Sequence, residues 1–432
     1  MNLRKTAVLL PLFILLLCFS QIAFAENYRQ EVSVGLKYGE KAGNSFTVSS
    51  PGGVNVYNAV SGEILYSSAE KEDVYIEMGS TGFASYNKFY AENVAKISVQ
   101  SKDSSLVYCD SKPYRGYIYA EKRNSGDMVV INKVNTDDYV ASVLGKEMSY
   151  SWPIEALKAQ AVCARNYVLC RGSAHKAYGF DVCTTTHCQV YGGYESEHEN
   201  TRRAVEETKG IVAKYNGEVV SLFFFATSAG MTESVENVWG SEYGYLKSVA
   251  DPYENPNQAS RYTWSVKMTK SQIEEKLANA GASIGSLSSI RIDSLTQSGR
   301  VTKMTFIGTD GSYSPTLEKC RTVLGLYSQK FTVVSDASSM LVTTAGVASS
   351  PYSAINAGGE ILPISGFSAI GGVGAVNTVV IDANAAENYT FNGGGYGHGV
   401  GMSQWGARGM AENGFTYDAI LHHYFTNITL EK

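Results

Sequence analysis

The sequence predicts a mixed α+β fold with a β-rich lead-in, a core of helices and strands, and an inserted α+β lobe. Short runs of alternating apolar and polar residues, separated by Gly, Asn, Asp and Ser, fill residues 28–135. Apolar residues then recur at helical spacing in two consecutive stretches, residues 137–148 and 151–171. Residues 262–333 combine one amphipathic helical stretch with further strand patterns, which predicts a separate lobe.

Composition limits the kind of protein this can be. The chain has 432 residues, of which 44% are hydrophobic, and this is enough for two or three domains with ample cores. Its formal net charge is -5, whereas binding to nucleic acid calls for a basic patch. We therefore expect no nucleic-acid partner.

The first 25 residues have the pattern of an export signal. Arg4 and Lys5 precede an apolar run that extends through Ile22, and Ala23-Phe24-Ala25 supplies small residues for cleavage. A run of this length is also sufficient to remain as a membrane anchor. We expect an exported, extracytoplasmic protein that is either secreted or tethered to the membrane by this segment.

The lead-in, residues 26–110, is predicted to consist of short strands bounded by turn-forming residues. Tyr117 and Tyr119 would share one face of a further strand. Tyrosines in such positions more often pack half-buried against neighbouring side chains than bind a ligand. The expected strands are Glu31 to Tyr38, Ser45 to Ser49, Val54 to Tyr57, Asp73 to Glu77 and Met128 to Val134.

A helix is predicted from Asp137 to Met148. The hydroxyl of Thr136 is a candidate cap, and two acids follow in the first turn, where the helix dipole favours them. The apolar positions form one arc, and Glu147 lies near its middle. The members of the arc are Tyr139, Val140, Val143, Leu144 and Met148.

A carboxylate on the apolar side of a helix needs an explanation. Burying it unpaired costs several kcal/mol, so such a group raises its pKa, finds a partner or lines a cleft. Each outcome suits a general acid. The alternative is that the helix ends early and leaves Glu147 solvated.

The second helix follows Ser151-Trp152-Pro153, with Pro in its first turn and Glu155 placed to reach back to the helix start. Arg165 falls on a different face from the main apolar stripe. It could orient an anionic or hydroxyl-rich ligand, although an ordinary surface arginine fits the same position. The stripe comprises Ile154, Leu157, Ala161, Ala164 and Val168.

Four metal-binding side chains, His175, Cys183, His187 and Cys188, lie within fourteen residues. Their number and type suit tetrahedral zinc, but their spacing differs from that of ordinary zinc fingers. A Cys183–Cys188 disulfide or free thiols fit the pattern equally well. With four protein ligands, a zinc site here would be structural, with no position for an activated water.

Later segments add further polar candidates. A strand expected from Val219 to Phe225 leads into Ser228, but the G-x-S-x-G elbow of serine hydrolases is absent. A helix is expected from Thr201 to Thr208, and a closing helix from Thr416 to Phe425. The glycine-rich run of residues 393–410 lacks a phosphate-loop lysine, so its glycines would instead allow close approach to a bulky ligand.

Several long motifs in this chain resemble those of the SpoIID/LytB family. Glu147-Met148 and the run from Trp152 to Tyr167 match E-M and W-P-x-E-A-L-K-A-Q-A-V-x-A-R-x-Y. Residues 189–193 match Q-x-Y-x-G, and residues 321–331 match R-x-x-L-G-L-x-S-x-x-F. Residues 395–407 match G-Y-G-H-G-V-G-M-S-Q-W-G-A.

The resemblance implies a lytic transglycosylase that cuts bacterial glycan strands stripped of their stem peptides. Glu147 would protonate the oxygen between N-acetylmuramic acid and N-acetylglucosamine, then accept the C6 hydroxyl proton, leaving a 1,6-anhydro end. This chemistry requires no cofactor. The resemblance implies a substrate-facing role for His398 and Gln404 and a sugar-hydroxyl contact for Ser228, and it favours zinc at the Cys/His cluster without deciding the matter. We also expect Arg165, Gln189 and Tyr191 to bind substrate.

The domains expected on this basis are a catalytic core at residues 111–254, a lobe with a soft connector at residues 255–374, and a return to the core at residues 375–432. A sporulation context would imply a cell-wall amidase and a polytopic membrane protein as partners. The second hypothesis is non-catalytic, because LytB-like members act as enhancers of an amidase. A zinc hydrolase is a third, which the four-ligand cluster argues against.

Overall fold

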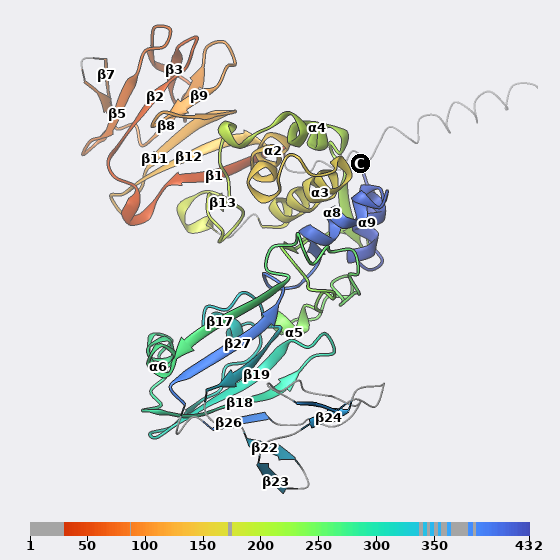
Figure 1. The fold of residues 1–432 in the computed structure, drawn as a ribbon. Helices are drawn as coiled ribbons and strands as arrows, with labels where there is room; N and C mark the ends of the chain where they lie inside the picture. Colours follow the sequence, from red (N-terminus) through yellow and green to blue (C-terminus); the bar gives the residue numbers. More distant parts are fainter. Residues whose placement is uncertain are drawn as a thin grey trace, which may run out of the picture.

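The computed structural model describes residues 30–86, 88–171, 175–336 and 386–432, with five short strands between residues 340 and 382. It confirms the α+β fold class, with two β-sheets and a group of helices above a second sheet-containing lobe (Figure 1). The export signal expected at residues 1–25 lies outside the described residues. Within the described part, no helix is both long and apolar enough to span a membrane.

The N-terminal region is a sandwich of two sheets whose inner faces share one hydrophobic core (Figure 1). The seven-stranded sheet has the order β13-β1-β12-β11-β8-β3-β4 and comprises β1 (Glu31–Lys37), β3 (Val54–Asn58), β4 (Ile64–Ser67), β8 (Lys96–Ser101), β11 (Tyr117–Lys122), β12 (Met128–Asn135) and β13 (Val182–Cys183). The six-stranded sheet has the order β10-β9-β2-β5-β6-β7 and comprises β2 (Ser45–Ser49), β5 (Val74–Met78), β6 (Gly82–Ser85), β7 (Phe89–Glu92), β9 (Val107–Cys109) and β10 (Lys112–Tyr114).

The strand predictions for this region are confirmed to within one residue at each end. One sheet crosses the expected boundary at residue 110, because β11 pairs with β8 through Ile118 opposite Val99 and Tyr119 opposite Ser98. Tyr117 and Tyr119 are both half-buried, as expected. The lead-in and the start of the core are therefore joined through continuous hydrogen bonding.

Three helices follow, α2 (Thr136–Glu147), α3 (Ile154–Cys170) and α4 (Glu199–Glu207). The helix α3 is almost wholly buried, because its alanines allow α2, α4 and two C-terminal helices to contact it. The sequence predicts Thr136 as the N-cap of α2, which is wrong by one residue. The N-cap is Asn135, whose side chain accepts a hydrogen bond from Asp137 N, and Thr136 is already helical.

The predicted start of α3 also needs correction. Pro153 is its N-cap, and no side chain caps the helix. Glu155 does not reach back to the helix start, because its carboxylate binds Lys158 at 2.7 Å and accepts a hydrogen bond from Tyr417 N at 2.8 Å. The acid therefore ties α3 to the C-terminal segment.

The C-terminal residues contribute strands and helices to this core. β28 (Met402–Ser403) pairs in parallel with β16 (Phe224–Phe225), and β29 (Thr429–Glu431) pairs with β14 (Val212–Tyr215). The strand expected over residues 219–225 is interrupted: β15 (Glu218–Val219) and β16 belong to different sheets. The remaining helices of this part are α5 (Glu236–Trp239), α8 (Gln404–Glu412) and α9 (Tyr417–Tyr424).

The lobe has a hydrophobic core of its own. Its sheets have the orders β17-β27-β21 and β20-β19-β18-β26, so β27 belongs to the lobe although it follows residue 375. The elements are β17 (Thr263–Thr269), α6 (Lys270–Asn279), β18 (Leu287–Leu295), β19 (Val301–Gly308), β20 (Ser312–Tyr313), α7 (Lys319–Thr322), β21 (Phe331–Ser335), β26 (Val379–Asp382) and β27 (Asn388–Gly394).

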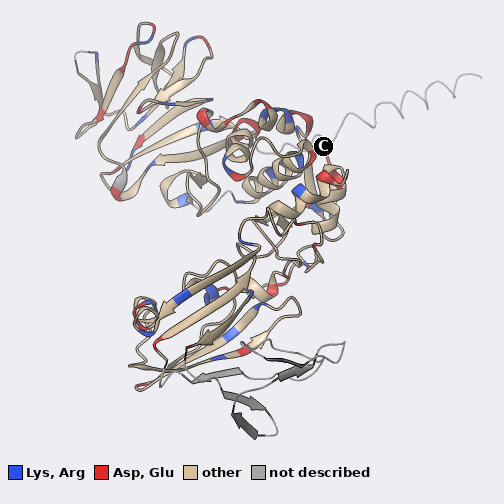
Figure 2. Cartoon of the chain, viewed as in Figure 1, with Lys and Arg blue, Asp and Glu red and all other residues tan. Residues whose placement is uncertain are grey.

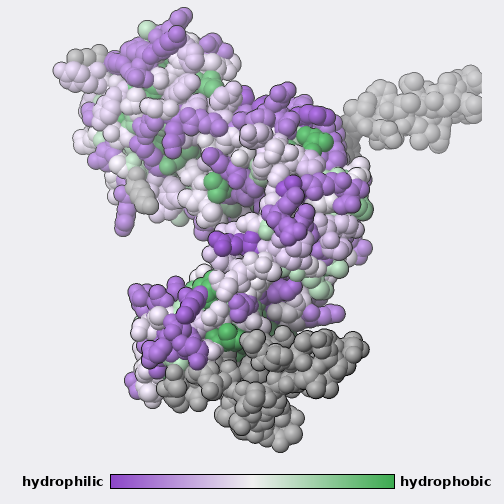
Figure 3. Space-filling model, in the orientation of Figure 1, coloured by the Kyte–Doolittle hydropathy of each residue, from purple (hydrophilic) through white to green (hydrophobic). Residues whose placement is uncertain are grey.

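The soft connector expected within residues 255–374 lies largely outside the described residues. Its described parts include two hairpins, β22 (Met340–Thr343) with β23 (Gly346–Ser349), and β24 (Ser353–Ile355) with β25 (Ile361–Pro363). Acidic and basic residues are interspersed along the described chain in Figure 2. Hydrophobic residues appear there only as small patches (Figure 3).

Candidate active site

Glu147 is the last residue of α2 and is half-buried. The helix ends there because Met148 turns to an extended conformation, with φ of -129° and ψ of 148°. Gly145, two residues earlier, allows the helix to approach the turn at residues 193–196: a Cβ at this position would lie 1.7 Å from the Ser196 carbonyl oxygen. The glycine therefore sets the depth at which the end of α2 is buried.

Two other segments contact the Glu147 carboxyl group. The Val190 backbone N–H donates a hydrogen bond to it, and Gln404 Nε2 lies 3.5 Å from Oε2 and 3.3 Å from the Glu147 carbonyl oxygen. Val190 lies within the Q-x-Y-x-G match, and Gln404 begins α8. Three of the sequence segments that resembled one family therefore meet at one carboxyl group.

Burial raises the pKa of Glu147 above its ordinary value of 4.5. The hydrogen bonds from Gln404 and from the Val190 N–H oppose this rise, because both favour the ionised form. The balance of the three effects keeps the protonated acid available at a higher pH than for a solvated glutamate. A carboxyl group with these properties can donate a proton and later accept one.

A buried hydrogen-bonded network fixes the start of α8. Ser403 is its N-cap and accepts a hydrogen bond from Gly406 N. Its hydroxyl also donates to Glu254 Oε1 at 2.5 Å, and burial raises the pKa of Glu254 to about 7. The Glu254 carboxylate further accepts the backbone N–H groups of Ser228 and Ala229. The position of Gln404 thus depends on this buried acid.

Two tryptophans follow Glu147 and Gln404 closely in the chain. The rings of Trp152 and Trp405 lie 4.9 Å apart, and the Arg408 guanidinium lies over both, at 5.4 Å and 4.8 Å. Both indoles are only half-buried, so part of each ring faces solvent. The motif matches contained these residues, but a sequence does not show that the rings meet.

Arg165 is not exposed to a ligand. It is 2% exposed, and its Nε and Nη2 donate to Asp137 Oδ1 at 3.0 Å and 2.8 Å. Its Nη1 donates to the Ile211 carbonyl oxygen at 3.1 Å. The guanidinium joins α2, α3 and the start of β14, which is a structural arrangement and not the ligand contact that was expected.

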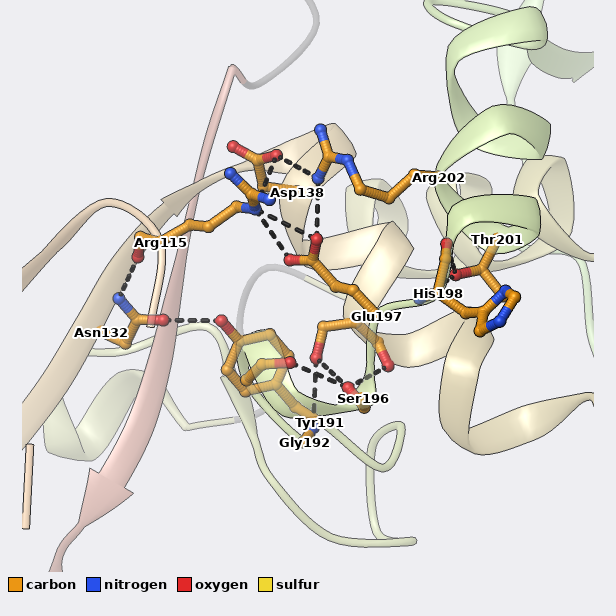
Figure 4. Close-up of polar contacts among 12 residues, drawn as sticks. Arg115, Asn132, Asp138, Tyr191, Gly192, Ser196, Glu197, His198, Thr201 and Arg202 are labelled. Atoms are coloured by element: carbon orange, nitrogen blue, oxygen red, sulfur yellow. Dashed lines mark hydrogen bonds and ion pairs between the residues drawn. The ribbon is translucent and has the colours of Figure 1, made fainter. Parts of the chain in front are cut away.

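Gln189 and Tyr191 lie on either side of Val190 and are both buried. Gln189 Oε1 accepts a hydrogen bond from the Tyr139 hydroxyl at 3.2 Å, whereas its Nε2 has no partner among the described residues. The Tyr191 hydroxyl donates to Asn132 Oδ1 at 2.7 Å (Figure 4). Both residues therefore support the segment that carries the Val190 N–H.

Ser228 and His398 are also held by the protein itself. The fully buried Ser228 donates from its hydroxyl to Asp251 Oδ2 at 2.9 Å. His398 Nδ1 accepts from Val400 N at 3.1 Å, and its ring lies among Phe223, Phe225 and Trp239. Burial lowers the pKa of His398 to about 4, so the ring is neutral at neutral pH. No contact joins either side chain to Glu147 in the described structure.

The four predicted metal ligands converge. Their ligand atoms lie within 4.8 Å of one another, and neither cysteine forms a disulfide. Cys188 Sγ lies 3.4 Å from His175 Nε2 and 3.5 Å from His187 Nδ1, and Cys183 Sγ lies 3.9 Å from His187 Nδ1. Tetrahedral zinc with ordinary bond lengths places sulfur and nitrogen ligands about 3.6 Å apart, so these residues fit zinc.

Known proteins share these segments. A family model described as "Stage II sporulation protein" matches residues 124–215, which include Glu147 and the four candidate metal ligands. The chain is 32% identical over 308 residues to an uncharacterized protein of Brachyspira hyodysenteriae (strain ATCC 49526 / WA1), covering 70% of this chain and 68% of that protein.

Two relatives from Bacillus subtilis (strain 168) have descriptive names. The "Amidase enhancer" is 32% identical over 305 residues, 67% of this chain and 39% of that protein. The chain therefore spans well under half of the length of this relative. "Stage II sporulation protein D" is 27% identical over 322 residues, 70% of this chain and 76% of that protein.

Proposed function

The chain belongs to the SpoIID/LytB family, and from this premise we propose that it is a lytic transglycosylase acting on bacterial cell-wall glycan. The proposed substrate is a strand without stem peptides. The bond cut joins C1 of N-acetylmuramic acid to the oxygen of N-acetylglucosamine. The products are a 1,6-anhydro end and a free hydroxyl, and no water is consumed.

The surroundings of Glu147 support this reaction best. In the first half, the protonated carboxyl group donates its proton to the glycosidic oxygen as the C1–O bond breaks. In the second half, the resulting carboxylate accepts the proton of the C6 hydroxyl as that oxygen bonds to C1. One group performs both steps, so its pKa must allow both forms. Burial favours the protonated form, and the bonds from Gln404 and Val190 favour the ionised form.

The electrostatic surroundings of Glu147 also favour a one-carboxylate route. Ordinary glycosidases use two carboxyl groups about 5–9.5 Å apart, the second serving as nucleophile or base. Within the described residues, the groups that shift the pKa of Glu147 are the Gln404 amide and the Val190 N–H, with no carboxylate among them. An internal hydroxyl of the substrate then takes the place of water.

A zinc ion bound by His175, Cys183, His187 and Cys188 would fill all four positions and stabilise the fold without taking part in the reaction. Tyr139 lies on α2, the helix that carries Glu147, and connects it to the segment that follows the cluster: it packs against Tyr191 with ring centroids 5.3 Å apart and hydrogen-bonds to Gln189. The ion would thus hold the 175–193 segment, and with it the Val190 N–H that reaches Glu147.

The second candidate is a non-catalytic enhancer of a cell-wall amidase, favoured by the name of one relative. In either case, we propose an exported protein that meets glycan outside the cytoplasm, with an amidase and a polytopic membrane protein as partners in a sporulation context. Incubating the purified protein with denuded glycan strands and no amidase distinguishes the two. Anhydro ends detected by mass spectrometry support the enzyme. Their absence, together with faster peptide release when an amidase is added, supports the enhancer.

A further inference from the structure

The outer face of the seven-stranded sheet differs sharply from its inner face. Side chains alternate along each strand, so neighbouring positions point to opposite faces. On β3, β8 and β11, one set of positions consists of fully buried apolar residues that face the second sheet. The other set is aromatic and polar and lines a hollow of about 880 Å³. The apolar set is Val54, Val56, Ile97, Val99 and Ile118.

The register of the strands explains the hollow. Tyr57 lies opposite Ser98 on the neighbouring strand, and Ser98 lies opposite Tyr119 on the next. Residues paired in this way project from the same face, and neighbouring strands are about 4.8 Å apart. Tyr57 and Tyr119 therefore project from the same face of the sheet about 10 Å apart, with the small Ser98 between them. Tyr117, two residues from Tyr119, extends the aromatic row along β11.

The polar groups of this face include donors and acceptors with little net charge. Lys96 pairs with Glu121 at 3.4 Å, and Lys133 pairs with Glu31 at 3.7 Å. Gln100 adds an exposed amide that can both donate and accept. A polyanion would need unpaired positive charge, and the chain as a whole carries -5. An apolar partner would need an apolar surface, which these groups interrupt.

Tyrosine rings beside mixed hydrogen-bonding groups suit a pyranose polymer. The C–H groups on the face of a sugar ring can pack against a tyrosine ring. The hydroxyl and acetamido groups at the edge of the sugar then reach polar side chains. The surface is open along the sheet, as an extended strand requires. These features favour a carbohydrate over a nucleic acid, a lipid or an apolar peptide.

The first hollow adjoins a second one at the start of α2. A second hollow of about 310 Å³ shares Gln100 and Tyr117 with the first and extends to Arg115 and Asp138. Arg115 is itself bound to Glu197 and lies near Asp138 (Figure 4). Asp138 is in the first turn of α2, and Glu147 is nine residues later, or about 14 Å along the helix. One long strand could therefore reach both places.

We propose that this tyrosine groove, made by Tyr57, Ser98, Gln100, Tyr117, Tyr119 and Lys133, is a second carbohydrate-binding site that holds an extended glycan strand outside the Glu147 site. That the strand is cell-wall glycan rests on the proposed function. The groove would retain the polymer while the Glu147 site acts on it, or while a partner enzyme does.

The test measures binding of denuded glycan strands to the full chain carrying Glu147→Gln, so that no strand is cut. In this background, the double variant Tyr57→Ala, Tyr119→Ala should weaken the affinity for glycan by about tenfold, because it removes two of the tyrosine rings that would contact the sugars. The matched control replaces two exposed tyrosines of the other sheet, Tyr75 and Tyr90, and should leave the affinity unchanged.

A second variant distinguishes loss of binding from misfolding. Gln100→Ala changes one exposed side chain shared by both hollows and should weaken binding about threefold with an unchanged melting temperature. Equal affinity of all variants for glycan would overturn the proposal, even if the unsubstituted protein cuts strands. Weakened binding by the groove variants would support the groove even if no anhydro ends form. Preferential binding of polyphosphate over glycan would overturn the choice of ligand.

Discussion

The Gln404 side-chain amide lies 3.3 Å from the carbonyl oxygen and 3.5 Å from the carboxylate of Glu147, although 257 positions separate the two residues. The contact brings the start of α8 to the end of α2. It also gives the C-terminal glycine-rich segment a direct electrostatic effect on the proposed acid.

The first prediction concerns pH. The protonated form of Glu147 is the acid, so strand cleavage should fall as the pH rises through its raised pKa. The Gln404 amide favours the ionised form, so Gln404→Ala should raise that pKa and move the alkaline limb upward by up to about one pH unit. Rates measured from pH 4 to pH 9 would show this shift.

The control for this experiment is Gln258→Ala, which changes an exposed glutamine in a turn of a different segment. Its pH profile should match that of the unsubstituted protein. A downward shift of the alkaline limb in the Gln404 variant would contradict the direction of the effect assigned to this amide.

The second prediction concerns Gly145. Ala is usually the better helix former by about 1 kcal/mol, but a Cβ here would meet the Ser196 carbonyl oxygen. Gly145→Ala should therefore lower the free energy of unfolding by about 1–3 kcal/mol and reduce cleavage, because Glu147 lies two residues away. Gly79→Ala is the matched control, since its nearest contact would be at 3.6 Å. A stabilised Gly145 variant would show that α2 is not packed this closely.

The third prediction separates structure from ligand binding at Arg165. Removing one partner of a largely buried ion pair costs about 3 kcal/mol, so Arg165→Ala should destabilise the protein by roughly this amount. Arg203→Ala breaks an exposed pair with Glu207 and should cost less than about 0.5 kcal/mol. If the Arg165 variant instead has normal stability but no longer binds glycan, Arg165 contacts the ligand, as expected from the sequence.

The fourth prediction concerns the Cys/His cluster. We expect about one zinc per chain by elemental analysis, and a lower melting temperature after a strong chelator. Cys188→Ser should reproduce the chelator effect, whereas Cys320→Ser, at a buried cysteine of the lobe, should leave the zinc content unchanged. Metal-free protein with an unaltered melting temperature would contradict a structural zinc site.

Periodicity and motifs predicted the two candidate-site residues that meet, one on α2 and one on α8. Glu147 stood out because it interrupts an apolar arc, and Gln404 because it lies in a long motif. The contacts of Arg165 could not be read in this way. Its partner Asp137 is 28 positions away, and their pairing depends on how α2 crosses α3.

Two other differences have similar physical causes. Asn135 and Thr136 are adjacent and both carry a capping oxygen, so local sequence could not decide which one caps α2. The sequence shows only that Ser228 follows a predicted strand, whereas Asp251 and Glu254 supply the carboxylates that its hydroxyl and backbone N–H bind. Such contacts are set by loops whose paths have no periodic pattern.

The most direct test compares the unsubstituted protein with Glu147→Gln on denuded glycan strands, with no amidase present. Mass spectrometry of the soluble products should show 1,6-anhydro-muramic ends from the first protein. The variant should release them at least about 100-fold more slowly at an unchanged melting temperature. Equal release by both proteins would show that Glu147 is not the acid. No release by either would contradict the proposal that the protein is a lytic transglycosylase.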